Sequence, residues 1–330
     1  MLQRYMNSCV KNKYVPFLFY FCMQIMLKTD MENKKSLVGA WVEAARPRTL
    51  PASVSPVLLG CALAYYDGAF DVVPAVLCLL VALFAQIASN FANDYFDFKK
   101  GADREDRLGP ERAVAEGWIT PKAMLTGTFV TLGLACAAGL LLVCFADWRL
   151  IGVGIAIAIC VLAYSAGPFP LAYNGLGDVC VLLFYGIIPV CFTYYIQTLN
   201  FSLLSFLLSV ALGLLSVNIL IVNNYRDYEQ DKAARKRTTI VLFGRRAGRV
   251  FYVLNECMAF LLVLPLILDA PWWILFLFGI LFALCFYTTR ELFTLEGRAL
   301  NRTLGHTARN VFLFASVLSL LFLYIGGVSN

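Results

Sequence analysis

The sequence predicts an all-α, multi-pass transmembrane bundle of about nine helices. Of its 330 residues, 60% are hydrophobic and 15% are charged, and the mean hydropathy of +0.74 lies well above that of soluble domains. Apolar runs recur at the length of roughly 20 residues that crosses a hydrocarbon core of about 30 Å. Because a backbone in lipid must satisfy its own hydrogen bonds, we expect these runs to be helices.

Polar or Gly- and Pro-containing breaks separate the apolar runs and define the predicted spans. In chain order, the spans are 49–66, 72–92, 123–146, 149–165, 177–198, 201–222, 249–269, 271–289 and 308–327. We expect residues 36–330 to form a single transmembrane domain that contains all of them.

Residues 1–35 are predicted to be an amino-terminal extension outside that domain. The apolar stretch 14–27 follows a basic start but is short for a span, and no small-residue cleavage site of a signal peptide follows it. Met31 offers an alternative start. We expect the extension to be surplus or to lie at the membrane interface, and we assign it no function.

The distribution of Lys and Arg predicts the orientation in the membrane. With nine spans, the amino terminus shares one side with the connections that follow the second, fourth, sixth and eighth spans. All of the 27 Lys and Arg residues except Arg149 lie on that side, whereas the opposite connections carry Asp67, Asp71, Asp147 and Asp269. The positive-inside rule then predicts a cytoplasmic amino terminus and an external carboxyl terminus in the cytoplasmic (inner) membrane. The net charge of +6 therefore reflects topology, and we expect no nucleic-acid partner.

Two polar stretches at corresponding helix ends share a pattern. Residues 93–97 read Asn-Asp-Tyr-Phe-Asp after the second span, and residues 223–227 read Asn-Asn-Tyr-Arg-Asp after the sixth. The recurrence four helices later suggests a duplicated four-helix unit. Because the apolar positions have diverged while the polar pattern persists, we expect the two stretches to share a chemical task.

The acidic and amide side chains in these stretches favour a divalent-cation site. Residues four apart on a helix share a face, so Asn93 and Asp97 point one way, and so do Asp227 and Asp231. Carboxylate and amide oxygens are ligands that Mg²⁺ prefers, completed by water and substrate phosphates. The two clusters therefore predict cations that bridge a diphosphate. The alternative is a solvated acidic loop beside the lipid headgroups, although unpartnered acidic residues at a membrane boundary are costly.

Basic residues beside the two stretches are candidates for contacts with that diphosphate. Arg107, Arg112, Lys236 and Arg237 can stabilise the charge that develops as the diphosphate leaves. For each of them, membrane topology alone is the competing interpretation.

The two motifs resemble those of the UbiA superfamily of intramembrane prenyltransferases, which carry Asn-Asp-x-x-Asp after helix two and Asp-x-x-x-Asp after helix six. The stretches 45–51, 93–110, 167–178 and 223–227 are most similar to the 1,4-dihydroxy-2-naphthoate polyprenyltransferase branch of menaquinone biosynthesis. The resemblance spans about residues 41 to 310 and implies a UbiA-like helical bundle in a lipid bilayer.

The resemblance also implies a reaction. A polyprenyl group would pass from a polyprenyl diphosphate to 1,4-dihydroxy-2-naphthoate, with loss of carbon dioxide and diphosphate, to give demethylmenaquinol. Mg²⁺ is the implied cofactor, with ligands among Asn93, Asp97, Asn224, Asp227 and Asp231, and the implied catalytic carboxylates are Asp94, Asp97, Asp227 and Asp231.

Three further residues are candidates for substrate contacts. Arg46 and Arg48 precede the first span and can bind the carboxylate of the aromatic acid, with interfacial anchoring as the alternative. Tyr164, at the end of the fourth span, can contact the diphosphate or cation, or anchor at the interface.

The chain departs from the general superfamily pattern at two places. The aspartate that the pattern places four residues after Asp97 is replaced by Gly101, and Asp103 stands two residues later, as in the naphthoate branch. Asp103 is therefore a candidate substrate-binding residue of undefined role. The usual Gly-Lys-x-Thr sequence after the second motif reads Arg-Lys-Arg-Thr at 235–238, which leaves the loop conformation open.

Two alternatives compete with the naphthoate prediction. One is a UbiA-type enzyme with another aromatic acceptor, such as 4-hydroxybenzoate, homogentisate or haem, which the stretch 167–178 disfavours by resemblance. The other is a secondary transporter, since repeated halves are also a transporter feature. The acidic residues lie at helix ends on one side and not at mid-span, which argues against alternating access.

Overall fold

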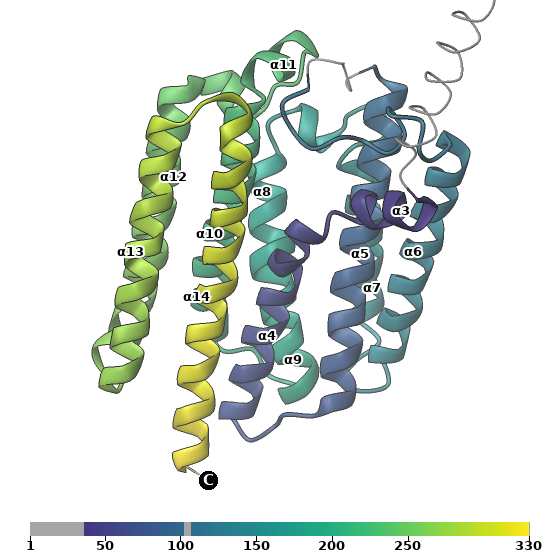
Figure 1. Ribbon diagram of the computed structural model, residues 1–330. Helices are drawn as coiled ribbons and strands as arrows, with labels where there is room; N and C mark the ends of the chain where they lie inside the picture. The colour runs from purple at the N-terminus through teal and green to yellow at the C-terminus, as the bar shows by residue number, and fades with distance from the viewer. Residues whose placement is uncertain (1–35, 102–106, 330) are drawn as a thin grey trace, which may run out of the picture.

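The computed structural model describes residues 36–101 and 107–329, and every regular element in these residues is a helix (Figure 1). The predicted all-α class is therefore confirmed. The predicted extension 1–35 lies outside the described residues. The longer helices stand side by side and are joined by short connections. The α-helices are α3 (Leu37–Ala45), α4 (Leu50–Tyr66), α5 (Val72–Lys99), α6 (Pro121–Leu142), α7 (Leu150–Ala163), α8 (Gly177–Leu182), α9 (Ile188–Thr198), α10 (Leu203–Arg226), α11 (Tyr228–Ala233), α12 (Thr239–Leu268), α13 (Trp272–Thr294) and α14 (Leu300–Ser329).

The helix lengths agree with a multi-pass membrane protein. Within the described ranges, seven helical segments are long and apolar enough to span a bilayer, and the bent pair α3 and α4 adds an eighth. The shorter apolar helix α7 lies where the fourth span was predicted. One of the seven is Gly177–Thr198, in which a π-helical turn, η3 (Leu183–Ile187), joins α8 to α9. Each predicted span thus corresponds to a helix.

Three helices extend further at the motif end than their apolar runs predict. α5 continues to Lys99, α12 begins at Thr239 and α14 begins at Leu300. Hydropathy marks only the part of a helix that lies in lipid, whereas backbone hydrogen bonding continues through polar residues. Gly244 has a φ of +84°, which is not helical, and it separates the first turn of α12 from the rest of that helix by a kink.

Side-chain caps fix where several helices begin. The Asp71 carboxylate accepts a hydrogen bond from the backbone N–H of Val73 at the start of α5, at 2.8 Å. The Thr238 hydroxyl accepts one from Val241 at the start of α12, at 3.3 Å. Such caps satisfy donors that the first helical turn leaves unpaired. Thr238 thereby anchors the basic run after the second motif to the body of the bundle.

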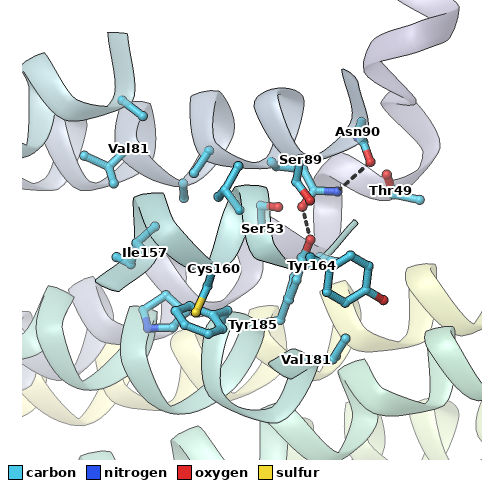
Figure 2. Close-up of a pocket in the computed structure, with 18 of the residues that line it drawn as sticks. Thr49, Ser53, Val81, Ser89, Asn90, Ile157, Cys160, Tyr164, Val181 and Tyr185 are labelled. Atoms are coloured by element: carbon cyan, nitrogen blue, oxygen red, sulfur yellow. Dashed lines mark hydrogen bonds between the residues drawn. The ribbon is translucent and has the colours of Figure 1, made fainter. Parts of the chain in front are cut away.

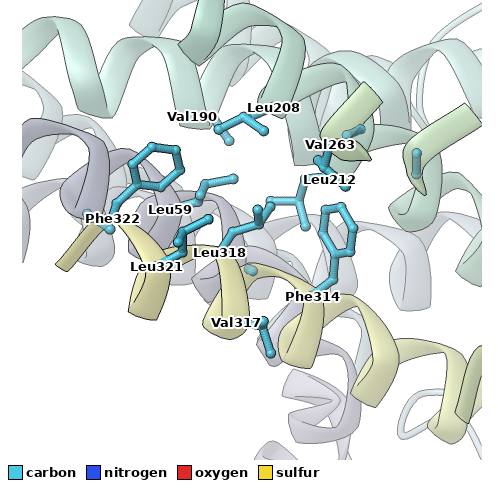
Figure 3. Close-up of a cluster of buried hydrophobic side chains, with 14 of the residues drawn as sticks. Leu59, Val190, Leu208, Leu212, Val263, Phe314, Val317, Leu318, Leu321 and Phe322 are labelled. Atoms are coloured by element: carbon cyan, nitrogen blue, oxygen red, sulfur yellow. The ribbon is translucent and has the colours of Figure 1, made fainter. Parts of the chain in front are cut away.

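The largest buried apolar cluster joins the first half of the chain to the second (Figure 3). Leu59 of α4 packs in it with Leu208 and Leu212 of α10, Val263 of α12 and Phe314 of α14. α4 also packs against α5. The cluster therefore fixes α10, which carries the second motif, relative to α5, which carries the first.

A close glycine contact brings η3 against α10. A Cβ atom added to Gly186 would lie 2.4 Å from the Cα atom of Gly213 and 2.6 Å from the carbonyl oxygen of Ser209. Both distances are shorter than any real Cβ contact, and both neighbours are backbone atoms that cannot rotate away. Small residues at such crossings let membrane helices approach closely.

We expect Gly186→Ala to lower the free energy of unfolding by about 1–3 kcal/mol, because the added methyl group forces η3 and α10 apart. Gly133→Ala in α6 is the matched control, since a Cβ there meets nothing within 4 Å. Thermal unfolding of the two purified variants in detergent measures the difference. Equal midpoints for the two variants would contradict the packing argument.

Candidate active site

The ends of α5 and α10 that carry the two motifs line one polar cavity of about 110 Å³. Asn93 and Asp97 come from the last two turns of α5, while Asn224 and Asp227 come from the end of α10. The short helix α11 brings Asp231 to the same cavity. Two stretches that are far apart in the sequence therefore meet at one end of the bundle.

Asp97 is buried and receives donors from three separate segments. The Tyr173 hydroxyl donates to its Oδ1 atom at 2.9 Å. The Arg112 guanidinium lies 3.3 Å from Oδ2, and the Lys236 ammonium lies 3.6 Å from the same oxygen. Because these groups come from the loop after α5, the loop before α8 and the loop after α11, Asp97 is a focus around which the cavity is organised.

The Lys236 ammonium links the two motifs. It lies 3.6 Å from Asp97 Oδ2 and 3.9 Å from Asp231 Oδ1. A cationic group thus stands between one carboxylate of each motif. This arrangement stabilises the convergence of acidic groups that would otherwise repel one another.

Burial has the largest effect on the pKa of Asp231, the last carboxylate of the second motif. It raises the pKa of Asp231 from 3.8 to about 6. The ammonium of Lys236 acts in the opposite direction, whereas the negative charges of Asp227 and Asp97 raise the pKa further. The carboxyl of Asp231 is therefore protonated more readily than that of an exposed aspartate.

Arg226 holds Asp227 in a fixed orientation. Its Nε and Nη2 atoms donate to the two carboxylate oxygens of Asp227 at 2.7 and 2.6 Å. Further bonds go to Asn223 Oδ1 at 2.8 Å and Asn301 Oδ1 at 2.6 Å. The side chain is only 2% exposed. The sequence analysis did not single out Arg226, although its place directly before a motif aspartate was the available signal.

Sequence reasoning also missed Tyr173, which lines the cavity, and Lys100, which contacts the Tyr173 ring. The Lys100 ammonium lies 4.3 Å from the centroid of the Tyr173 ring, and that of Lys236 lies 4.7 Å from it. Lys100 also donates to the backbone carbonyl of Ser165 at 2.6 Å. Burial lowers the pKa of Lys100, which the charge of Asp97 opposes. Tyr173 lies within the stretch 167–178, one of those that carry the resemblance. A tyrosine at this position does not by itself indicate a contact with Lys100 or Lys236.

Most of the predicted substrate-binding residues lie in the cavity wall. The predicted substrate-binding residues that line the cavity are Arg46, Arg107, Arg112, Tyr164 and Lys236. Arg237 does not line it: its side chain is exposed, and its backbone N–H donates to the carbonyl of Tyr173 at 2.9 Å. Asp103 and the side chain of Arg48 lie outside what the structure describes.

Asp94 also stays outside the cavity. Its two carboxylate oxygens accept hydrogen bonds from the backbone N–H groups of Ala113 and Val114, at 3.1 and 3.3 Å. The side chain is buried at 2% exposure. In this structure Asp94 therefore anchors the loop after α5, which carries Arg112, and does not join the other three aspartates.

The donor set of the cavity fits a hard divalent cation that shares its ligands with a phosphate group. Carboxylate and amide oxygens from both motifs line it. Among the described residues, no three His, Cys, Asp or Glu side chains are arranged to hold a metal ion by themselves. Mg²⁺ is commonly bound by one or two carboxylates together with substrate phosphates, which matches a set of this kind.

A larger apolar cavity of about 740 Å³ adjoins the polar one. Arg46, Asn93, Tyr164 and Asn223 line both. Away from the junction, the wall of the larger cavity includes Leu140 of α6 and Ile151 and Ile155 of α7. The same three side chains are exposed on the outside of the bundle. The apolar cavity therefore extends from the polar site to the outer apolar surface at α6 and α7.

Known proteins are similar to this chain in sequence and in fold. The model of the UbiA prenyltransferase family matches residues 53–317. The 1,4-dihydroxy-2-naphthoate octaprenyltransferase of Haemophilus influenzae is 37% identical over 235 residues, which cover 69% of this chain and 76% of the relative. That of Mycobacterium tuberculosis is 38% identical over 235 residues, covering 70% and 79%. A UbiA homologue from Archaeoglobus fulgidus, bound to GPP and Mg²⁺, has a TM-score of 0.59 at 20% identity and covers 85% of this chain and 97% of its own.

Proposed function

The chain belongs to the UbiA prenyltransferase family, and from this premise we propose that it is a 1,4-dihydroxy-2-naphthoate polyprenyltransferase of menaquinone biosynthesis. It transfers a polyprenyl group from a polyprenyl diphosphate to the naphthoate, and releases diphosphate and carbon dioxide. The product is demethylmenaquinol. The observation that carries the proposal is the junction of a polar cavity, lined by both aspartate motifs, with an apolar cavity that reaches the lipid-facing surface.

The polar cavity is proposed to hold the diphosphate together with divalent cations, which the acidic and amide side chains would bind. Asn93, Asp97, Asn224, Asp227 and Asp231 are the proposed ligands, and Mg²⁺ is the proposed ion. When bound, the ion draws negative charge onto the departing diphosphate. Arg112 and Lys236, which face Asp97, supply positive charge to the same leaving group. No protein nucleophile is required, because the aromatic ring supplies the electrons.

The apolar cavity is proposed to hold the isoprenoid chain. Burying each methylene group contributes about 0.8 kcal/mol, so a long polyprenyl tail stays in the bilayer. The exposed wall residues on α6 and α7 support lateral entry from lipid. The positive-inside rule supports a cytoplasmic active site in the inner membrane, since the Lys and Arg residues within 36–101 and 107–329, apart from Arg149, lie towards the motif end of the bundle.

Product analysis tests the proposed function directly. The purified full chain in lipid nanodiscs is incubated with Mg²⁺, geranylgeranyl diphosphate and an equimolar mixture of 1,4-dihydroxy-2-naphthoate, 4-hydroxybenzoate and homogentisate. Mass spectrometry should detect prenylated, decarboxylated naphthoate as the main product, and EDTA should abolish it until Mg²⁺ is restored. A product built on another acceptor, or no product, would refute the assignment.

Binding of the divalent cation is expected to weaken as the pH falls through about 6. The pKa of Asp231, raised to about 6, means that the folded protein holds this proton more tightly than the unfolded chain does. Asp231 therefore stabilises the metal-free fold at low pH, and that contribution is lost as the pH rises through about 6. A cation needs the ionised carboxylate, so below the pKa its apparent affinity falls by up to about tenfold per pH unit.

Calorimetric titration with Mg²⁺ and inorganic diphosphate, between about pH 5 and pH 7, measures this dependence. The Asp231→Asn variant is the control, because it has no proton to exchange at that position and should bind weakly at both ends of the range. Equal wild-type affinity across the range would show that Asp231 is not a ligand.

A further inference from the structure

The wall of the apolar cavity contains a small polar cluster away from the aspartate motifs. Ser53 of α4, Gln86 of α5 and Tyr185 of η3 line it. Ser53 and Tyr185 are labelled in Figure 2. α4 packs against both α5 and η3, so the three side chains come from neighbouring elements. An isoprenoid chain has no hydrogen-bonding groups. A cavity that held only such a chain would therefore not require these three polar side chains.

The hydrogen bonds of the cluster run in one direction, from the Tyr185 hydroxyl to the backbone carbonyl of Ala45. The Tyr185 hydroxyl donates to Gln86 Oε1, and Gln86 Nε2 donates to Asn90 Oδ1 at 3.4 Å, as the dashed lines of Figure 2 mark. Asn90 Nδ2 in turn donates to the backbone carbonyl of Ala45 at 2.9 Å. Because the Tyr185 proton is used within this chain, its phenolic oxygen retains the capacity to accept a bond from a ligand.

Ser53 is the polar group of the cluster that the protein itself does not satisfy. Its side chain is 5% exposed, and its Oγ atom is buried with no hydrogen-bond partner in the part of the chain that the structure describes. Most serine hydroxyls in membrane helices bond a carbonyl one turn earlier, as Ser55 does with Pro51 at 2.7 Å. A buried hydroxyl without a partner is costly, which points to a partner that enters the cavity.

The backbone at Tyr185 is specialised to hold that side chain in place. Pro189 has no N–H group, so it cannot donate to the carbonyl of Tyr185 as an α-helix would require. The wider turn Leu183–Ile187 accommodates this. π-helical turns of this kind are frequent at functional sites.

We propose that Ser53 and Tyr185, with Gln86 behind them, form the subsite that recognises a ring hydroxyl of the aromatic acceptor. The inference rests on the proposed function, which supplies a dihydroxylated naphthoate as the ligand. The 1-hydroxyl of that molecule lies beside its carboxylate and bonds to it internally. The 4-hydroxyl has no internal partner and therefore needs one from the protein. Arg46, which lines the same cavity, remains the proposed partner of the carboxylate.

Steady-state kinetics of the full chain in nanodiscs test the subsite. Ser53→Ala should raise the KM for 1,4-dihydroxy-2-naphthoate by about 5- to 10-fold and leave the KM for geranylgeranyl diphosphate unchanged. Ser55→Ala, two residues along the same helix, is the matched control and should change neither value, because its hydroxyl bonds only to its own helix. Tyr185→Phe, which keeps the ring and removes the hydroxyl, should reproduce the effect of Ser53→Ala.

A second readout uses 1-hydroxy-2-naphthoate, which lacks the 4-hydroxyl, as a competitive inhibitor. The wild type should bind it about 5- to 10-fold more weakly than the dihydroxy acid, and both variants should lose this discrimination. If an active wild type and its two variants discriminate equally, the hydroxyl partner of Ser53 is merely water and the subsite is refuted. If the wild type does not prenylate the naphthoate at all, the proposed function fails and this inference fails with it.

Discussion

The Asp97→Asn variant is expected to lose roughly a thousandfold in turnover, the largest effect of any single substitution considered for this protein. Asparagine keeps an oxygen that can accept the hydrogen bond of Tyr173, so the local structure should persist. It removes the negative charge on which Arg112, Lys236 and the proposed cation depend. The loss of turnover should therefore appear in the chemical step and in cation binding. Folding stability should fall as well, because the buried guanidinium of Arg112 keeps its charge without its counterion.

Initial rates of prenyl transfer at saturating substrates measure the loss of turnover. The Mg²⁺ concentration for half-maximal rate should rise in the same variant, and the thermal midpoint should fall, because Arg112 loses its buried partner. Asp269→Asn is the control, since that residue is exposed at the end of α12 remote from the motifs. If Asp97→Asn retained more than about a tenth of wild-type turnover, Asp97 would not be the central carboxylate of the site.

The second large effect is expected for Arg226, which positions Asp227. Arg226→Lys preserves the positive charge but replaces a two-pronged contact with a single point of attachment. A displacement of about 1 Å in a reacting geometry can reduce turnover by about a hundredfold, and we expect a loss of that order. Arg226→Ala leaves Asp227 without its partner at a nearly buried position and should also lower stability by about 3–5 kcal/mol.

An independent variant tests the position of Arg226 without changing its charge. A Cβ atom on Gly109 would lie 2.7 Å from Arg226 Nη2, the atom that bonds both Asp227 and Asn223. Gly109→Ala should therefore raise the Mg²⁺ concentration for half-maximal rate in the same direction as Arg226→Lys, although no charged group has been altered. Wild-type Mg²⁺ dependence in both variants would exclude a positioning role for Arg226.

The sequence by itself determined the fold class and the approximate spans. Each span is an apolar run whose length matches the bilayer, and the hydrogen bonding that lipid enforces is local to the run. The two motifs were also visible, because their pattern recurs at corresponding helix ends. Helix ends were less accurate. The start of α14 was missed because it is polar, and the start of α12 was missed because the polar stretch 244–249 separates its apolar first turn from the rest of the helix.

The direction of individual side chains was decided only by the tertiary structure. Asp94 and Asp97 are three residues apart on α5, which separates them by about 60° around the helix axis. Both were predicted to be catalytic, yet Asp97 faces the polar cavity while Asp94 bonds the loop after α5. That difference depends on how α5 is rotated against its neighbours, which the sequence of one helix does not specify. The catalytic role of Asp97 stays a prediction until turnover is measured.

Contacts between distant segments were likewise beyond the sequence. Such contacts join Tyr173 to Asp97, Lys236 to both motifs, and Arg226 to Asn301, and in each case the residues belong to different helices or loops. The unpartnered hydroxyl of Ser53 is visible only once the surrounding helices are placed. Local pattern fixes which segments enter the membrane and which residue types they carry. Packing of the helices against one another fixes which of those residues share a cavity, because that depends on all of the helices at once.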